Sequence, residues 1–153
     1  MDGRDKPGHD EPLFQAAVMS FALDPRLAGD TLLIGDLELS RVLLMNDAHY
    51  PWLILVPRRA GLAEIVDLDA VDRATLIEEV AAAAAFLRRL PGVDKLNLGA
   101  LGNVVRQLHV HVLGRAIGDP AWPGPVWGSG PPRAYAPDAA EAMIAQARAA
   151  LGL

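Results

Sequence analysis

The sequence predicts an α+β domain in which helices pack against a five-stranded antiparallel sheet. Five short segments with strand-like hydrophobic patterns are separated by turn residues, and one long segment with helical spacing lies between the third and the fourth. A second helical segment ends the chain. This order lacks the regular alternation of strand and helix that is typical of a parallel sheet, so we expect an antiparallel sheet with one long helix and a C-terminal helix.

Composition restricts the class of protein. The chain has 153 residues, of which 52% are hydrophobic and 22% are charged, enough for one domain with a buried core. The formal net charge of −5 argues against nucleic acid or an anionic membrane as the main partner. The absence of cysteine excludes disulfides and thiolate nucleophiles. No apolar run approaches the roughly 20 residues of a membrane span, and no cationic segment opens a signal peptide, so we expect a cytoplasmic protein.

The N-terminal region carries little folding information. Residues 1–12 are charged, contain Gly and Pro, and lack apolar periodicity, which predicts a disordered tail before a single domain over residues 13–153. Residues 13–27 have a mixed pattern, typical of a short helix or an extended entry.

Three strands are expected next. The first two cover residues 31–34 and 41–45 and are joined across Gly35-Asp36, which is turn chemistry. The third covers residues 52–57, a continuous apolar run that is typical of a strand covered on both faces.

The long helix is expected to begin after Asp69, a good N-cap residue, and to end at Pro91-Gly92. Its apolar positions recur at helical spacing, at Leu76, Val80, Ala83, Leu87 and Leu90. The C-terminal helix is expected to begin at Pro137 and to run toward Leu151.

Two further strands lie between these helices. Residues 95–101 and 107–113 alternate with period two around a Gly102-Asn103 turn, which predicts a hairpin. A loop rich in Pro and Gly follows and carries Trp122 and Trp127. We expect these indoles to anchor the loop rather than to stack on a base.

Two of the four histidines lie in the last predicted strand. Side chains alternate across a strand, so Gln107, His109 and His111 share one face, with neighbours about 6.5 to 7 Å apart. The intervening apolar residues must face the core. The polar ladder therefore lines a cleft or the outer face of the sheet.

Three interpretations of this ladder remain open from the residues alone. It can be a half-exposed sheet face without function. It can be part of a metal site, although His49 or Asp47 would have to supply a third ligand from another strand. It can also support nucleophilic catalysis on phosphorus, since histidine, with a reference pKa of about 6.5, offers a neutral ring nitrogen as nucleophile. A second imidazole would then stabilise the phosphate.

The run QLHVHVLGR resembles the signature of the histidine-triad (HIT) family, His-φ-His-φ-His-φ-φ with φ hydrophobic, except that Gln107 stands in place of the first histidine. The order of LLMND, the strand WLILVPRR, a long helix and a final strand pair also resembles that family over residues 31–115. The resemblance implies a HIT-like fold and a nucleotide hydrolase or transferase without cofactor or resident metal.

The resemblance also implies roles for single residues. His109 would attack the α-phosphorus of a nucleotide and form a nucleotidyl-histidine that water cleaves, and His111 would contact the phosphate. Gln107 would orient His109 or a loop carbonyl. The substrate would be a purine nucleotide, a dinucleoside polyphosphate or a nucleoside phosphoramidate, and the protein would be a homodimer, as family members commonly are.

Further positions are implied as substrate-binding. Asn46 would bind ribose hydroxyls, although an ordinary turn role is equally open from its type. Asn103 and Gly102 would lie near the phosphate, with Gly99 in the same anion-binding nest. Arg58 and Arg59 could attract polyphosphate, but paired basic residues at the end of a strand are usually solvated, and we expect that role here.

Two departures from the family pattern support an alternative. Gln107 cannot carry a proton near neutral pH, and Val104 stands where many members have a hydroxyl residue. A nucleotide-binding or sensing protein with little turnover is therefore the second hypothesis.

Overall fold

A computed structural model of the chain describes residues 20–153. The tail expected over residues 1–12, and the first residues of the domain expected from residue 13, lie outside the described residues. The helices are α2 (Pro25–Asp30), α3 (Ala70–Arg88) and α4 (Pro137–Leu151), with a short 3₁₀ helix η1 (Ile65–Asp67). The strands are β1 (Thr31–Asp36), β2 (Ser40–Met45), β3 (Trp52–Pro57), β4 (Lys95–Gly99) and β5 (Val110–Arg115).

The expected α+β fold is confirmed. The five strands form one sheet in the order β1-β2-β3-β5-β4, and every neighbouring pair is antiparallel. The expected long helix and C-terminal helix are both present. Asp69 caps α3, as expected, by accepting a hydrogen bond from the backbone N–H of Asp72 at 2.7 Å.

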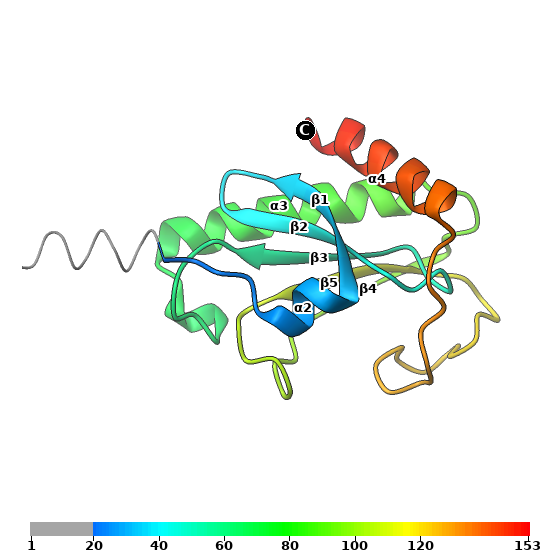
Figure 1. The fold of residues 1–153 in the computed structure, drawn as a ribbon, viewed down its shortest axis with the longest axis horizontal. Helices are drawn as coiled ribbons and strands as arrows, with labels where there is room; N and C mark the ends of the chain where they lie inside the picture. The colour runs from blue at the N-terminus through cyan, green and yellow to red at the C-terminus, as the bar shows by residue number, and fades with distance from the viewer. Residues whose placement is uncertain (1–19) are drawn as a thin grey trace, which may run out of the picture.

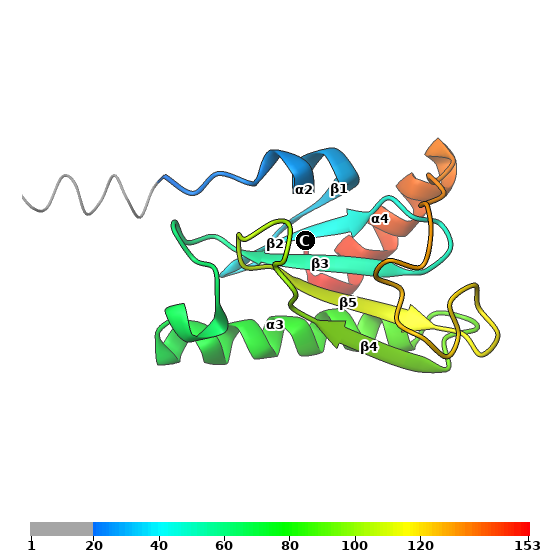
Figure 2. The ribbon, with the colours of Figure 1, turned by 90° about the horizontal axis from the view of Figure 1, so that it is seen from below.

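The two faces of the sheet are covered by different elements. In Figures 1 and 2, α3 runs along one face and α2 lies on the opposite face, while α4 lies beside α3 near β1. The larger hydrophobic cluster joins the sheet to α3 and α4, and the smaller one lies on the α2 face. β3 has apolar side chains in both clusters and is buried along its whole length, which confirms that this strand is covered on both faces.

The alternation along the last strand places the two histidines on the α2 face. Leu108, Val110 and Val112 belong to the cluster beneath α3, as the sequence predicts. His111 and Leu113 face the other way, opposite Ile54 and Trp52 of β3 respectively. β5 begins at Val110 rather than at residue 107, because the backbone N–H of Leu108 bonds to the carbonyl of Leu62 instead of to β3.

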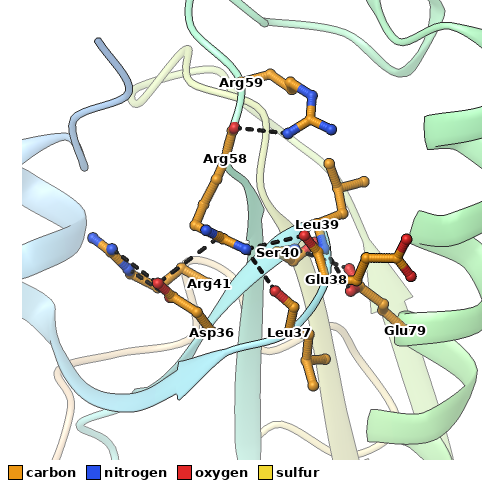
Figure 3. Close-up of polar contacts among 9 residues, drawn as sticks. All are labelled: Asp36, Leu37, Glu38, Leu39, Ser40, Arg41, Arg58, Arg59 and Glu79. Carbon is orange, nitrogen blue, oxygen red and sulfur yellow. Dashed lines mark hydrogen bonds and ion pairs between the residues drawn. The ribbon is translucent and has the colours of Figure 1, made fainter. Parts of the chain in front are cut away.

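The first turn differs from the prediction. Gly35 and Asp36 lie within β1, paired with Val42 and Arg41, and the chain reverses after them, before Ser40. Figure 3 shows why: the buried carboxylate of Glu79 on α3 accepts hydrogen bonds from the backbone N–H groups of Leu39 and Ser40, at 2.9 and 3.0 Å. A contact from the distant helix therefore sets this turn.

The two arginines that follow β3 take part in structural contacts. Arg58 donates to the carbonyls of Leu37 and Glu38, at 2.6 and 3.0 Å (Figure 3). Arg59 pairs with Asp72 near the start of α3, with a closest N to O distance of 2.9 Å. Both guanidinium groups thus tie the end of β3 to its neighbours.

Within residues 20–153, no helix combines the length and apolar character needed to cross a membrane.

Replacing Glu79 with Ala should leave two buried amide N–H groups without their acceptor. We expect a loss of about 2 to 4 kcal/mol in the free energy of unfolding, measured by urea denaturation. The matched control is Glu78→Ala, because Glu78 is the preceding residue and is exposed. It should change stability by less than about 0.5 kcal/mol. Equal effects of the two variants would contradict the role of Glu79 in the turn.

Candidate active site

The imidazole of His109 is held by a backbone carbonyl. Its Nδ1 lies 2.6 Å from the carbonyl oxygen of Gln107, and the side chain is buried. A carbonyl can only accept, so Nδ1 carries the proton and donates it. In the neutral ring, Nε2 then has a free lone pair, which is the requirement for a nucleophile.

The imidazole of His111 is held in the opposite tautomer. The indole Nε1 of Trp52 donates to His111 Nδ1 at 3.0 Å in a buried contact. An indole N–H can only donate, so Nδ1 must be the acceptor and the proton of the neutral ring is on Nε2. Burial, together with the nearby His109, lowers the pKa of His111 to about 4. His111 is therefore a neutral hydrogen-bond donor at neutral pH.

The two imidazoles are in contact. Their ring centroids are 5.0 Å apart and the ring planes are inclined by 65°. This separation allows one phosphoryl group to contact both rings. The pair offers a lone pair on one ring and an N–H donor on the other, which can attack and stabilise the same phosphorus centre.

Trp127 covers His111 from the loop that follows β5. Its ring lies edge-on to His111 at 5.4 Å and to Trp52 at 6.5 Å between centroids. Gly99 pairs with His111 across β4 and β5, and a Cβ at this position would lie 2.9 Å from the Trp127 indole. The absence of a side chain at Gly99 leaves the space for Trp127. Trp127 therefore lies against a candidate site residue, so its position is not explained by loop anchoring alone.

Trp122 has the anchoring position that the sequence predicts for the loop. The guanidinium of Arg115 lies 5.6 Å from the centre of its ring. Arg115 is buried and also forms a two-bond pair with Asp119, with both bonds at 2.8 Å. These contacts hold the loop against the end of β5.

The side chain of Gln107 does not bond to His109 or His111. Its Oε1 accepts from the backbone N–H of Asp24 at 2.9 Å, and its Nε2 donates to the carbonyl of Ala22 at 2.8 Å. The amide therefore bonds to the N-terminal segment as a backbone peptide group would. It tethers residues 22–24 beside the site, while the backbone carbonyl of Gln107 orients His109.

This tether brings an ion pair near His109 that the sequence alone did not indicate. Asp24 caps α2 and pairs with Arg26, whose Nη1 donates to the carbonyl of Val104 at 3.0 Å. The Arg26 side chain and backbone hold the pKa of the Asp24 carboxyl below its ordinary value, and His109 acts in the same direction. The Asp24-Pro25 pair is a helix-start signal in the sequence, but nothing local places it beside residue 107.

One cavity adjoins Gln107 and His109, and a second lies beside the two tryptophans that contact His111. One, of about 240 Å³, is lined by Gly102, Gln107 and His109 with residues of the segments 63–66 and 100–101. The other, of about 750 Å³, is lined by Asn46, Trp52 and Trp127 together with α2 and the loop 126–134. The predicted site residues thus fall around two openings rather than one.

Asn46 and Asp47 tie the end of β2 to the C-terminal part of the chain. Asn46 Oδ1 accepts from the backbone N–H of Tyr135 at 2.9 Å, and Asp47 Oδ1 accepts from that of Arg133 at 3.2 Å. Both bonds are structural, but they join the end of β2 to a segment that is remote in the chain, which differs from the local turn role that the residue types suggest. Within residues 20–153 the Asn46 Nδ2 group has no hydrogen bond, and it lies at the larger cavity.

The turn residues are only partly assembled at the site. Gly102 has a φ of +71° and lines the cavity beside His109. Asn103 is exposed and lines neither cavity described above. Gly99 is the last residue of β4, so its amide is in a strand and not in the expected nest.

The alternative metal site lacks a third ligand in the described part of the chain. His49 Nδ1 lies 2.6 Å from Asp47 Oδ1, so the two residues that could supply a third ligand bond to each other. Among residues 20–153, no group of three or more His, Asp and Glu side chains is arranged to hold a metal ion.

Comparison with known protein families matches the region of the chain that contains His109 and His111. The model of the HIT domain family matches residues 27–117, more than half of the chain. The chain belongs to the HIT domain family. The resemblance identified from the sequence is therefore confirmed, and so is the HIT-like fold. No curated protein matches the chain significantly.

Solved structures of other HIT proteins are similar over most of their length. A histidine triad protein from Bradyrhizobium japonicum is 47% identical, with 86% of this chain and 98% of that chain covered and a TM-score of 0.83. One from Sinorhizobium meliloti is 46% identical, with 88% and 99% covered and a TM-score of 0.84. One from Marinobacter aquaeolei is 45% identical, with 86% and 96% covered and a TM-score of 0.84.

The buried neutral state of His111 has a measurable effect on stability. The pKa of His111 is lower in the folded HIT domain than in the unfolded chain, so the unfolded chain binds this proton first as the pH falls. As the pH falls from about 6.5 to about 4, protonation of His111 should lower the free energy of unfolding by up to about 3 kcal/mol. Above pH 6.5 this group should have no such effect. Urea unfolding of wild type and His111→Gln across this range measures the difference. Parallel pH profiles would contradict the assignment.

Proposed function

We propose that this chain is a nucleotide phosphohydrolase that acts through a nucleotidyl-histidine intermediate on His109. The observation that carries the proposal is the pair of opposite tautomers: His109 has its lone pair on Nε2, and His111 has its proton there. Family membership supports the same class of chemistry, because the HIT superfamily contains nucleotide hydrolases and transferases.

The proposed reaction has two displacements at phosphorus. The lone pair of His109 Nε2 forms a bond to the α-phosphorus, and the bond from phosphorus to the leaving group breaks with its electron pair. His109 keeps the proton on Nδ1, where it remains hydrogen-bonded to the carbonyl of Gln107, and this carbonyl stabilises the positive charge that develops on the ring. Water then attacks the phosphorus and releases one proton to solvent, the bond to His109 breaks with its electron pair returning to Nε2, and the nucleoside monophosphate leaves.

The substrate class is a purine nucleotide derivative, such as a dinucleoside polyphosphate or a nucleoside phosphoramidate. The cavity of about 750 Å³ lies within the range of about 300 to 1,000 Å³ that small-molecule sites occupy. We propose that Asn46 donates from Nδ2 to the ribose in this cavity. Gly102 and Asn103 are proposed to lie toward the phosphate, although only Gly102 lines a cavity with His109.

We also propose a cytoplasmic homodimer. β4 is an edge strand of the sheet, and its Leu98 is exposed to 54%, while Ile77 on the neighbouring helix α3 is exposed to 61%. Unpaired strand edges with exposed apolar side chains are surfaces on which a second copy can pair.

A second candidate function is nucleotide binding with little turnover. It is favoured by the use of the Gln107 side chain as a tether and by Val104, whose side chain is 74% exposed and has no hydrogen-bond donor. Calorimetry with a panel of nucleotides, followed by hydrolysis assays on the same panel, separates the candidates. Tight binding without turnover would favour the second.

His109→Ala should abolish turnover, because it removes the nucleophile. With α-labelled substrate and rapid acid-free quenching, wild type should retain a covalent nucleotidyl label and His109→Ala should not. The comparison variant is His49→Ala, which removes a histidine that lines the larger cavity and bonds to Asp47 rather than to His109 or His111. Because His49 takes no part in the bond to phosphorus, this variant should keep the covalent label at saturating substrate. Full activity in His109→Ala would exclude the proposal.

Gln107→Leu should release residues 22–24 while leaving the backbone carbonyl that orients His109. We expect faster amide exchange at Asp24 by hydrogen–deuterium exchange and a decrease in kcat/KM of less than about a thousandfold, the scale of about 4 kcal/mol. Arg106→Leu is the control, because Arg106 is the exposed neighbour.

Restoring histidine with Gln107→His should also have a modest effect, and a larger change would show that residue 107 takes a direct part in catalysis.

A further inference from the structure

Trp52 makes a specific contact that the proposed chemistry needs. It lies on β3, two residues before Ile54, the residue that pairs directly with His111. Its indole N–H points to His111 Nδ1 at 3.0 Å, and both side chains are buried. This is the one hydrogen bond of the His111 ring within residues 20–153.

We propose that Trp52 is a positioning residue for catalysis, and that its indole N–H fixes His111 as the Nε2–H tautomer, a donor to the phosphoryl group that cannot act as a second nucleophile. This inference rests on the proposed function, because it gives His111 its part in the same reaction. It also explains how two adjacent histidines on one sheet face have different roles.

The hydrogen bond allows only one protonation state. Trp52 Nε1 has a proton and no lone pair, so a proton on His111 Nδ1 would place two N–H groups against each other at 3.0 Å. This excludes both the other neutral tautomer and the imidazolium ion while the contact is made. With Nδ1 occupied, the chemistry of His111 is restricted to donation from Nε2.

The indole cannot easily turn away. Trp52 is held edge-on by Tyr50 on one side, at 6.2 Å between ring centroids, and by Trp127 on another, at 6.5 Å. The backbone of Trp52 pairs with Leu113 of the same strand as His111. The donor is therefore set by the sheet and by neighbouring rings, which is the rigidity that an oriented catalytic group requires.

Trp127 provides a matched comparison for the test. Its ring contacts His111 as closely as the ring of Trp52 does, with centroids at 5.4 Å and 5.6 Å respectively. The Nε1 of Trp127 is buried but has no hydrogen-bond partner in the described chain. Replacing each tryptophan with Phe therefore removes an indole from His111 in both cases, but the hydrogen bond in only one.

The first measurement is nitrogen NMR of ¹⁵N-labelled protein at neutral pH, with His111 assigned by the loss of its signals in His111→Gln. In wild type we expect His111 Nδ1 to have the shift of an unprotonated nitrogen and Nε2 that of a protonated one. A scalar coupling through the hydrogen bond should connect Trp52 Nε1 with His111 Nδ1. Trp52→Phe should move the Nδ1 shift and populate the second tautomer, and Trp127→Phe should do neither.

The second measurement is turnover of the best substrate in the panel. Trp52→Phe should lower kcat by about tenfold or more, the scale of one lost transition-state hydrogen bond, with a smaller change in KM. Trp127→Phe should lower kcat by less. Thermal unfolding and circular dichroism of both variants show whether either has lost its fold.

The outcomes separate this inference from the proposed function. A proton on His111 Nδ1 in wild type, or no coupling to Trp52, would overturn the inference even if Trp52→Phe failed to fold, because wild type alone decides this point. Equal kcat losses in the two Phe variants would also overturn it. Retained activity in His109→Ala would instead overturn the proposed function, with the tautomer of His111 unchanged.

Discussion

The antiparallel pairing of β3 with β5 is the constraint on which the candidate site depends. It aligns Ile54 with His111 and Trp52 with Leu113, which brings an indole donor to an imidazole 59 positions away in the chain. The apolar residues of β5 are buried beneath α3, so the histidines have to lie on the other face. A shift of one residue in this register would exchange the two faces and remove the site.

Each imidazole at this face is defined by the partner of its Nδ1. A carbonyl holds His109 and an indole holds His111, and because one partner only accepts and the other only donates, the free nitrogens differ in protonation. This arrangement needs no carboxylate or metal to distinguish the two rings. Burial strengthens the distinction, since it favours the neutral form of His111.

The glutamine in the triad motif has a structural explanation in this chain. A primary amide has one acceptor and one donor group in the geometry of a peptide bond, and Gln107 uses both on the backbone of residues 22–24. A histidine side chain cannot bond to both of these backbone groups in the same way. The substitution thus accompanies an N-terminal segment that passes beside the site and presents Asp24 and Arg26 there.

Much of the fold followed from local patterns, because the spacing of apolar residues reports which side of an element is buried. The alternation around residues 107–113, the capping of α3 by Asp69 and the continuous apolar run of β3 were all correctly predicted. The turn between β1 and β2 was misplaced because its N–H groups bond to Glu79, which lies about 40 positions away and has an ordinary helical pattern around it. Trp52 was assigned only to the buried strand, because its hydrogen bond to His111 also joins segments that are remote in the chain.

The class of fold, the family and the common sheet face of the two histidines can be predicted from the amino acids alone, because these depend on residue type and on the period of a strand. The tautomer of each ring, the tether of Gln107 and the place of Trp127 over His111 follow only from the folded chain. These features depend on hydrogen bonds and ring contacts between segments that are remote in the chain. Their geometry is set by strand register and loop packing, and no local pattern encodes either.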